Sequence, residues 1–186
     1  MHSIEEEFYS VREELLANLE GTILDVGSGT GVNFEHFHAN ARVIAVEPSE
    51  YMLEKSLTKL PAKATIETHH LSVTDDAMDD IIPDHSLDYV VCTLVLCTIP
   101  DQQLALQKFK QWLKPDGKLI VLEHIHAEHN PNRFFQNLIN PIWKVVGEGC
   151  HLNRDTDKTI KEAGFLPESE TYFKRSLRFY QGVFSV

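Results

Sequence analysis

Residues 24–34, LDVGSGTGVNF, place Gly27, Gly29 and Gly31 directly after a short apolar run. The run 22–26 has the length and composition of a buried strand. A glycine-rich turn between a strand and a helix brings backbone N–H groups close to a ligand at the carboxyl edge of a sheet. This stretch therefore predicts a ligand site in an α/β fold.

Short apolar runs alternate with amphipathic stretches on both sides of this turn. Strands joined by helices pair in parallel, so the alternation predicts a doubly wound α/β sheet. We expect helices over 4–19, 33–38, 49–60, 101–113 and 155–163, and Ser49 should cap the third of them. We expect strands over 22–26, 42–46, part of 65–74, 87–92, 118–123, 170–174 and 178–186.

The size and charge of the chain limit its function. Its 186 residues are 42% hydrophobic, which suits one globular domain spanning 1–186. The 28 acidic and 17 basic residues give a formal net charge of −11. Because nucleic-acid binding needs a basic face, we expect no nucleic-acid partner.

The cysteines and the N-terminal residues indicate a compartment. Cys92, Cys97 and Cys150 are too few and too scattered for a disulfide framework or a zinc site, which fits a reducing environment. The first residues are acidic where a signal peptide is basic and then apolar, and no stretch has the length of a membrane span. We therefore expect a cytoplasmic protein without a membrane span.

The spacing of the glycines and three acidic residues indicate the ligand. Val32 stands where the dinucleotide fingerprint Gly-x-Gly-x-x-Gly needs its third glycine, so the ligand should lack a pyrophosphate. Asp25 opens the turn and would attract a cation. Glu47 ends the second expected strand, where a carboxylate can accept both ribose hydroxyls, and Asp76, before Ala77, can accept an exocyclic amine. Together these features describe S-adenosylmethionine.

Four segments carry a family resemblance: LDVGSGTG, VEPS, DDA and WLKPDGKLIVLEH. With them the chain resembles the class I S-adenosylmethionine-dependent methyltransferases of the type 11 domain kind. VVCTLVLCTI, NPIW and GEGCHLNRDT make it most similar to the thiol S-methyltransferases. It departs from these relatives at Glu47, where they usually have Asp, at Asp116, which replaces a glycine of their turn, and in lacking their N-terminal membrane anchor.

The resemblance implies a Rossmann-like, seven-stranded, mostly parallel sheet with an antiparallel last strand. It also implies an enzyme that methylates a small molecule, preferably a thiol, and releases S-adenosylhomocysteine. The residues that we expect to bind the cofactor are Asp25, Gly27, Ser28, Gly29, Gly31, Glu47, Pro48, Asp76, Ala77 and Thr93.

A thiol acceptor must lose its proton, because the thiolate is the nucleophile. An imidazole suits this task. His124 follows the fifth expected strand and is the first candidate, and His151 in GEGCHL is the second. His124 and His126 alternate at a spacing that a metal could use, but a hydrogen-bonded role explains them better, so we expect no metal. Cys97 suits packing and pocket lining equally.

The acceptor pocket should come from an insertion at about 125–153, which is rich in His, Asn and aromatic residues. Apolar walls would favour a lipophilic acceptor. An amphipathic helix that covers the core explains the same pattern equally. The apolar residues in question are Phe134, Phe135, Ile139, Ile142 and Trp143.

Other functions stay open on the sequence. The acceptor can be quinone-like or phospholipid-like instead of a thiol. The chain can also bind S-adenosylmethionine without catalysis, since a fold does not imply an activity. A nicotinamide oxidoreductase is disfavoured by the glycine spacing and by the absence of a Tyr-x-x-x-Lys pair.

Overall fold

The computed structural model describes residues 4–146, 149–175 and 177–186. These residues form two compact units. The first contains the chain up to Val91 together with Trp112–Lys114, and the second contains Cys92–Gln111 and Pro115–Val186. The strands form a seven-stranded sheet in the order β3-β2-β1-β4-β5-β7-β6.

Helices and strands alternate through most of the chain. The helices are α1 (Ile4–Leu16), α2 (Glu50–Leu57), α3 (Met78–Ile81), α4 (Gln102–Trp112), α5 (Asn132–Val146) and α6 (Thr156–Glu162). The strands are β1 (Gly21–Val26), β2 (Ala41–Val46), β3 (Thr65–His69), β4 (Leu87–Thr93), β5 (Leu113–Ile125), β6 (Leu166–Lys174) and β7 (Arg178–Ser185).

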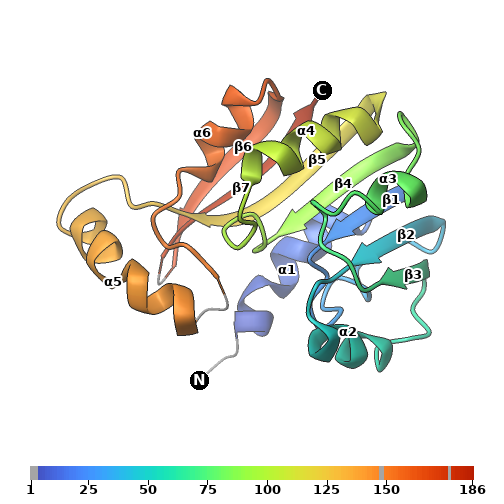
Figure 1. Cartoon of the computed structure of the whole chain (residues 1–186), viewed down its shortest axis with the longest axis horizontal. Coiled ribbons are helices and arrows are strands. Elements are labelled where there is room, and N and C mark those ends of the chain that lie inside the picture. The colour runs from blue at the N-terminus through green and yellow to red at the C-terminus, as the bar shows by residue number, and fades with distance from the viewer. Residues whose placement is uncertain (1–3, 147–148, 176) are drawn as a thin grey trace. The chain divides into compact units, whose positions relative to one another are not determined.

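In the first unit, β3, β2 and β1 lie side by side and run parallel (Figure 1). The last four residues of both β1 and β2 are buried, as expected for strands covered on both faces. Asp25 pairs with Ala45, and Val46 pairs with His69. The carboxyl ends of the three strands therefore meet at one edge of the sheet, where Glu47 follows β2 directly.

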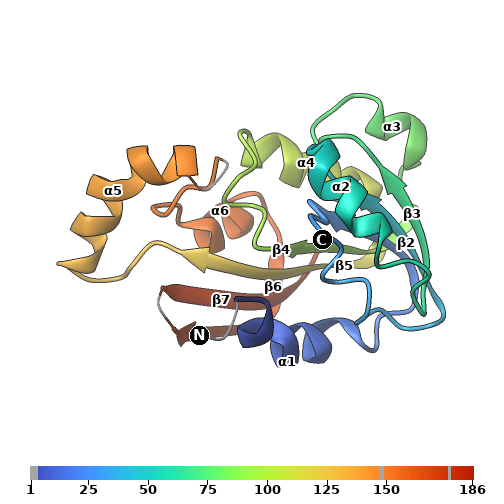
Figure 2. The ribbon, with the colours of Figure 1, turned by 90° about the horizontal axis from the view of Figure 1, so that it is seen from below.

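In the second unit, β7 runs antiparallel to both β5 and β6 (Figure 2). His124 of β5 pairs with Phe179 of β7. Almost every residue of the edge strand β6 is exposed, and its sequence LPESETYFK carries charges that discourage pairing with another chain. The predicted seven-stranded, mostly parallel sheet with an antiparallel last strand is confirmed.

The predicted helix over 33–38 is wrong. Residues 29–36 form successive turns with hydrogen bonds from Phe34 N to Gly31 O at 3.1 Å and from His36 N to Asn33 O at 3.0 Å. These are three-residue spacings, tighter than those of an α-helix. Phe34 and Phe37 are fully buried and anchor the turns, so packing holds this compact loop where the sequence pattern indicated a helix.

Most other boundaries agree with the prediction to within a few residues. Ser49 caps α2 as expected, with its hydroxyl accepting from Met52 N. The helices α1 and α2 end three residues earlier than expected, and β5 begins at Leu113, five residues before the predicted start. The extra residues of β5 include Pro115, Asp116 and Gly117, which do not look like a strand by composition.

The insertion contains a regular helix. Figures 1 and 2 show α5 beyond the carboxyl end of β5. Its sequence NRFFQNLINPIWKVV is strongly amphipathic, with Pro141 inside the helix. Among the residues that the structure describes, no helix combines the length and the apolarity needed to cross a bilayer.

Candidate active site

The glycine turn after β1 is held by its own backbone. Gly27, Gly29 and Gly31 have φ values of 60°, 55° and 75°, a region that glycine adopts without strain. Ser28 N donates to Val46 O at 3.0 Å, and Gly31 N donates to Ser28 O at 2.9 Å. The predicted turn therefore exists, with Ser28 buried inside it.

Gly29 and Gly31 are required for different reasons. A Cβ on Gly31 would lie 2.9 Å from the ring of Phe34 and 3.1 Å from Cβ of Ser56, so crowding excludes a side chain. A Cβ on Gly29 would approach no atom closer than 3.9 Å, the carbonyl oxygen of Gly27. Gly29 is therefore open on its side-chain side, where a ligand can approach the backbone.

Asp25 lies in β1 with no exposed surface. Its Oδ1 accepts a hydrogen bond from Nδ2 of Asn33 at 2.8 Å, and its Oδ2 has no partner among the described residues. Burial raises the pKa of Asp25 to about 7, although Asn33 and the charge of Arg12 act in the opposite direction. A buried carboxylate oxygen without a partner fits a cationic ligand group.

Glu47 is 6% exposed and holds the turn in place. Its Oε2 accepts from Gly29 N at 2.9 Å, and its Oε1 accepts from Ser49 N at 2.8 Å. Each oxygen keeps a second lone pair for a ligand hydroxyl. Glu47 thus joins β2, the glycine turn and the start of α2.

The other expected cofactor residues lie at or near the ends of strands. Pro48 is exposed beside Glu47. Asp76 and Ala77 are exposed in the turn between β3 and α3, and Ala77 precedes the first residue of α3. The first unit therefore contains every expected cofactor residue except Thr93, which ends β4 in the second unit and is buried there.

Glu123 is a second buried carboxylate, in β5 of the second unit, and sequence reasoning missed it. Its Oε1 accepts from both Val95 N and Leu96 N at 2.7 Å, and its Oε2 has no partner among the described residues. Burial raises the pKa of Glu123 to about 7, against the charge of His124 and the two backbone hydrogen bonds. The sequence feature that could have indicated its role is an acidic residue inside an apolar strand.

Glu123 and Arg154 together position the loop after β4. The guanidinium of Arg154 donates through Nη1 to Leu96 O at 2.8 Å and to Ile99 O at 2.6 Å. Leu94 has a φ of 58°, and its N–H donates to Leu122 O at 2.7 Å. The loop that carries Cys97 is therefore fixed by charged hydrogen bonds from β5 and from the segment before α6.

Two cysteines and a histidine meet at the end of β5. Nε2 of His124 lies 3.0 Å from Sγ of Cys150, and Sγ of Cys150 lies 3.6 Å from Sγ of Cys97. Cys97 and His124 are buried, and Cys150 is partly exposed. The expectation that these cysteines are scattered is therefore wrong: the chain folds Cys97 and Cys150 against each other.

The protonation states within this cluster follow from its contacts. The hydrogen bond between the sulfurs and burial raise the pKa of Cys97, and the same hydrogen bond, with that of His124, lowers the pKa of Cys150. Sγ of Cys150 donates to Sγ of Cys97, and Sγ of Cys97 donates to the carbonyl oxygen of Leu94 at 3.8 Å. Burial alone would lower the pKa of His124, but Cys150 and Glu123 outweigh it and raise that pKa. The contacts with His124 thus favour the ionised form of Cys150, and those with Cys150 favour the protonated form of His124.

The two candidate bases differ in their surroundings. Nδ1 of His124 is buried and has no partner among the described residues. His151 lies next to Cys150, and both its backbone N and its Nδ1 lie 3.1 Å from the carbonyl oxygen of Cys97. His151 therefore connects the segment after Gly149 to the loop that carries Cys97. This contact gives His151 a role in positioning that loop.

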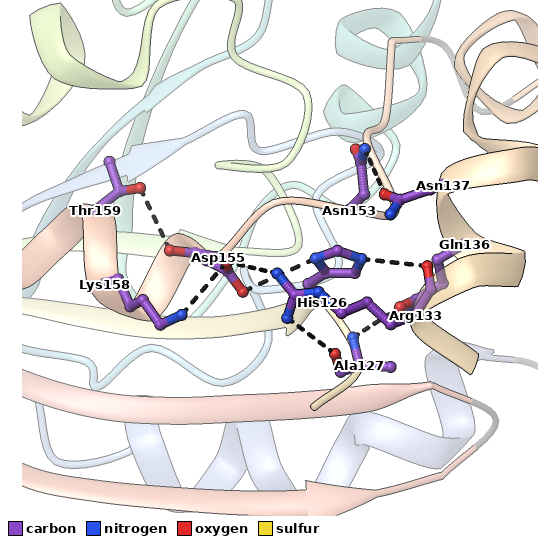
Figure 3. A network of polar contacts seen from close by, with 9 residues as sticks. All are labelled: His126, Ala127, Arg133, Gln136, Asn137, Asn153, Asp155, Lys158 and Thr159. Carbon is purple, nitrogen blue, oxygen red and sulfur yellow. Dashed lines mark hydrogen bonds and ion pairs between the residues drawn. The ribbon is translucent and has the colours of Figure 1, made fainter. Parts of the chain in front are cut away.

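His126 belongs to a polar network that joins the ends of β5, α5 and α6 (Figure 3). Its Nε2 lies 3.5 Å from Arg133 O, and its Nδ1 lies 4.0 Å from Asp155. Arg133 also pairs with Asp155 at 3.3 Å. His126 and His124 thus face different partners, and they do not form the pair that their spacing allowed.

The helix α5 presents its apolar side chains outward. Gln136 and Asn140 are its buried residues, and their side-chain oxygens accept from Ala127 N at 2.7 Å and Leu152 N at 2.8 Å. The five apolar residues in question are exposed, which contradicts the alternative of a helix that covers the core, whereas their lining of an acceptor pocket stays a prediction. Their exposed fractions are Phe134 62%, Phe135 52%, Ile139 44%, Ile142 70% and Trp143 39%. One of them, Trp143, hydrogen-bonds to the thiol of Cys150.

The insertion does contribute to a cavity elsewhere in the second unit. This cavity has a volume of about 360 Å³ and lies between residues 127–132 and the β6–β7 hairpin. Phe173 and Tyr172 give it apolar surface, and Arg178 gives it a charge. Arg178 is itself paired with Glu128 at 3.4 Å.

Comparisons with known proteins agree with this fold and these motifs. The methyltransferase domain family matches residues 24–121. Thiol S-methyltransferase TMT1B of Rattus norvegicus is 36% identical over 172 residues, which are 89% of this chain and 68% of the relative. Thiol S-methyltransferase TMT1A of Homo sapiens is 32% identical over 86% of this chain and 69% of the relative.

The solved structures support the same fold. A putative methyltransferase from Bacillus halodurans superposes with a TM-score of 0.69 at 20% identity, over 92% of this chain and 73% of that one. The family match and the thiol S-methyltransferase relatives confirm the predicted family, cofactor and enzyme class. The chain belongs to the S-adenosylmethionine-dependent methyltransferases, in the family of the thiol S-methyltransferases.

Proposed function

We propose that this methyltransferase transfers the methyl group of S-adenosylmethionine to the sulfur of small, lipophilic thiols in the cytoplasm. The names of its relatives support a thiol acceptor. The observation that carries the proposal is the cluster of Cys97, His124 and Cys150, whose donor atoms lie within 4.8 Å of one another. A histidine beside the acceptor thiol, as a base or as a cation, is the kind of group that favours its thiolate.

The residues of the first unit fit the cofactor. The unpartnered Oδ2 of Asp25 suits its ammonium group, and the buried hydroxyl of Ser28 is likewise without a partner among the described residues. Glu47 would accept the ribose hydroxyls, and Asp76 would accept the adenine amine. Gly29, which is open on one side, would allow the close approach of the backbone.

The bound cofactor supplies a methyl group that is already activated on a sulfonium. The protein must therefore align the acceptor and exclude water, and it needs no covalent intermediate. The acceptor thiol first loses its proton. His124 would take this proton, and the thiolate would then accept the methyl group that the bound cofactor supplies, so that a thioether and S-adenosylhomocysteine would be released.

We propose that the Cys97–His124–Cys150 cluster favours the thiolate of the acceptor. His124 remains the first candidate, because one of its nitrogens is without a partner among the described residues. The reducing compartment is supported by the three cysteines, all of which are free thiols. A lipophilic acceptor is supported by the exposed apolar residues of α5, which lie in the same unit.

The test is transfer of a labelled methyl group to matched pairs of small molecules, each thiol beside the alcohol of the same carbon skeleton. We expect labelled thioether from the lipophilic thiols and none from the alcohols. Product on alcohols or amines would discard the thiol assignment and keep the enzyme. No product on any acceptor, with measurable cofactor binding, would favour a domain that binds S-adenosylmethionine without catalysis.

A further inference from the structure

The cluster of Cys97, His124 and Cys150 offers one donor atom from each of three residues. Two are sulfurs and one is an imidazole nitrogen, and all lie within 4.8 Å of one another. We infer that this cluster is a Zn²⁺ site with three protein ligands and an open fourth position for the sulfur of the acceptor thiol. The acceptor part of this inference rests on the proposed function, whereas the metal part does not.

The distances suit zinc with little adjustment. Two sulfurs that each lie about 2.3 Å from a tetrahedral Zn²⁺ are about 3.8 Å apart, and a sulfur and a nitrogen on the same ion are about 3.5 Å apart. The two sulfurs are 3.6 Å apart here, and Cys150 Sγ lies 3.0 Å from His124 Nε2. These two pairs therefore need a shift of only about half an ångström. The third pair, Cys97 Sγ and the ring nitrogen of His124, lies within 4.8 Å, so entry of the ion also requires these two side chains to approach to about 3.5 Å.

The donor set selects a soft or borderline cation. Thiolate and imidazole ligands suit zinc, whereas magnesium and calcium prefer oxygen donors. The carboxylate of Glu123, whose charge acts on all three residues of the cluster, already accepts two backbone hydrogen bonds through Oε1. The positive charge of Arg154 acts on both cysteines and partly offsets a site that carries two thiolates.

The framework around the donors is rigid on two sides and adjustable on the third. His124 sits in β5 and pairs with Phe179 of β7. The carbonyl of Cys97 accepts two hydrogen bonds from His151. Cys150 follows Gly149, whose φ of 92° only glycine adopts readily, and it is the partly exposed member of the cluster. Cys150 can therefore make the small shift and leave a path for a ligand.

Three protein ligands with one free position are typical of catalytic zinc sites, while structural sites use four. A thiol that binds a metal ion does so as its thiolate. In the zinc-bound protein the ion would thus favour the reactive form of the acceptor, and His124 would serve as a ligand of that ion.

The metal part is tested by titrating the metal-free, reduced protein with Zn²⁺ alone and with Co²⁺ as a coloured substitute. We expect one equivalent of tightly bound metal and a sulfur-to-cobalt charge-transfer band. Cys150→Ser and Cys97→Ser should each weaken binding by at least about tenfold. Cys92→Ala, a buried cysteine outside the cluster, should bind as the parent protein does. Equal binding by parent and Cys150→Ser, with both shown to be folded by their melting curves, would overturn the site.

The acceptor part is tested by adding a thiol to the Co²⁺ protein in the presence of S-adenosylhomocysteine. A change in the cobalt d–d bands with the thiol, and none with the matching alcohol, is expected. Unchanged bands would overturn the open position. Thiol methylation that persists after chelation and proven metal loss would overturn the role of zinc in binding the acceptor and keep the proposed function. Stoichiometric metal without methylation of any thiol would do the reverse.

Discussion

The carboxylate of Glu47 accepts the backbone N–H of Gly29 through Oε2 at 2.9 Å and that of Ser49 through Oε1 at 2.8 Å. One side chain therefore fixes both the turn that would face the cofactor and the first turn of α2. A substitution of Glu47 should therefore weaken cofactor binding in two ways, because the contact with the ribose is lost and the glycine turn is less well fixed.

Glu47→Ala should weaken S-adenosylmethionine binding by at least about tenfold, because it removes the acceptor of two hydroxyls and of two backbone N–H groups. Glu47→Gln keeps one acceptor oxygen and should have a smaller effect. Calorimetric titration measures both, with Glu50→Ala, an exposed residue of α2, as the control. Unchanged affinity of Glu47→Ala would overturn the ribose assignment.

Asp25 should make cofactor affinity depend on pH. Burial raises the pKa of Asp25 to about 7 from an ordinary 3.8. A cationic ligand group favours the ionised carboxylate, so affinity should rise as the pH increases toward about 7 and then level off. Calorimetry at several pH values in two buffers should detect the released proton. Asp25→Asn should bind the cofactor more weakly, and its affinity should not depend on pH in this range. If the affinity of Asp25→Asn changed with pH as that of the parent protein does, another group would be responsible for the titration.

The same shift has a consequence for stability. Between about pH 4 and about pH 7 the native protein holds a proton at Asp25 that the unfolded chain releases. The contribution of Asp25 to the free energy of unfolding therefore falls as the pH rises through this window. Denaturant titrations of the parent protein and of Asp25→Asn should diverge as the pH increases, with the variant gaining relative stability. If the free energies of unfolding of the two proteins changed with pH in parallel, Asp25 would be ionised in the native state over this window.

The cofactor half of the site could be predicted because its residues carry a local pattern. The glycines and Asp25 lie within one turn, and Glu47 ends the neighbouring strand of a parallel sheet, where topology places it beside them. The prediction of a helix after the turn was wrong because no local pattern determines the structure there. Burial of Phe34 and Phe37 decides the conformation there, and tertiary packing is invisible in a local window.

The second unit was less predictable, because its important contacts join distant residues. Cys97 and Cys150 are separated by 53 positions and meet only in the folded chain. For α5 the sequence gives the amphipathic period but not the direction of the apolar face. That direction depends on Gln136 and Asn140, whose side chains satisfy backbone N–H groups outside the helix.

His124→Ala should lower turnover with a thiol acceptor by about 10²-fold or more while leaving the affinity for S-adenosylmethionine unchanged. The expected cofactor residues lie in the first unit, apart from Thr93, and His124 lies in the second, so the two effects separate. Single-turnover kinetics with labelled cofactor measures the loss. His129→Ala, a histidine in the loop after β5, is the control. Full activity of His124→Ala across a pH series would remove His124 from the reaction.

The orientation of α5 predicts that its polar residues stabilise the fold and its apolar ones do not. Asn140→Leu leaves Leu152 N without its acceptor in a buried position and should lower the free energy of unfolding by about 1–3 kcal/mol. Ile142→Ser, at a side chain that is 70% exposed, should change it by less than about 0.5 kcal/mol. Urea titrations of the two variants against the parent protein measure both values. If Ile142→Ser were the more damaging change, the apolar face of α5 would be the one that packs against the second unit.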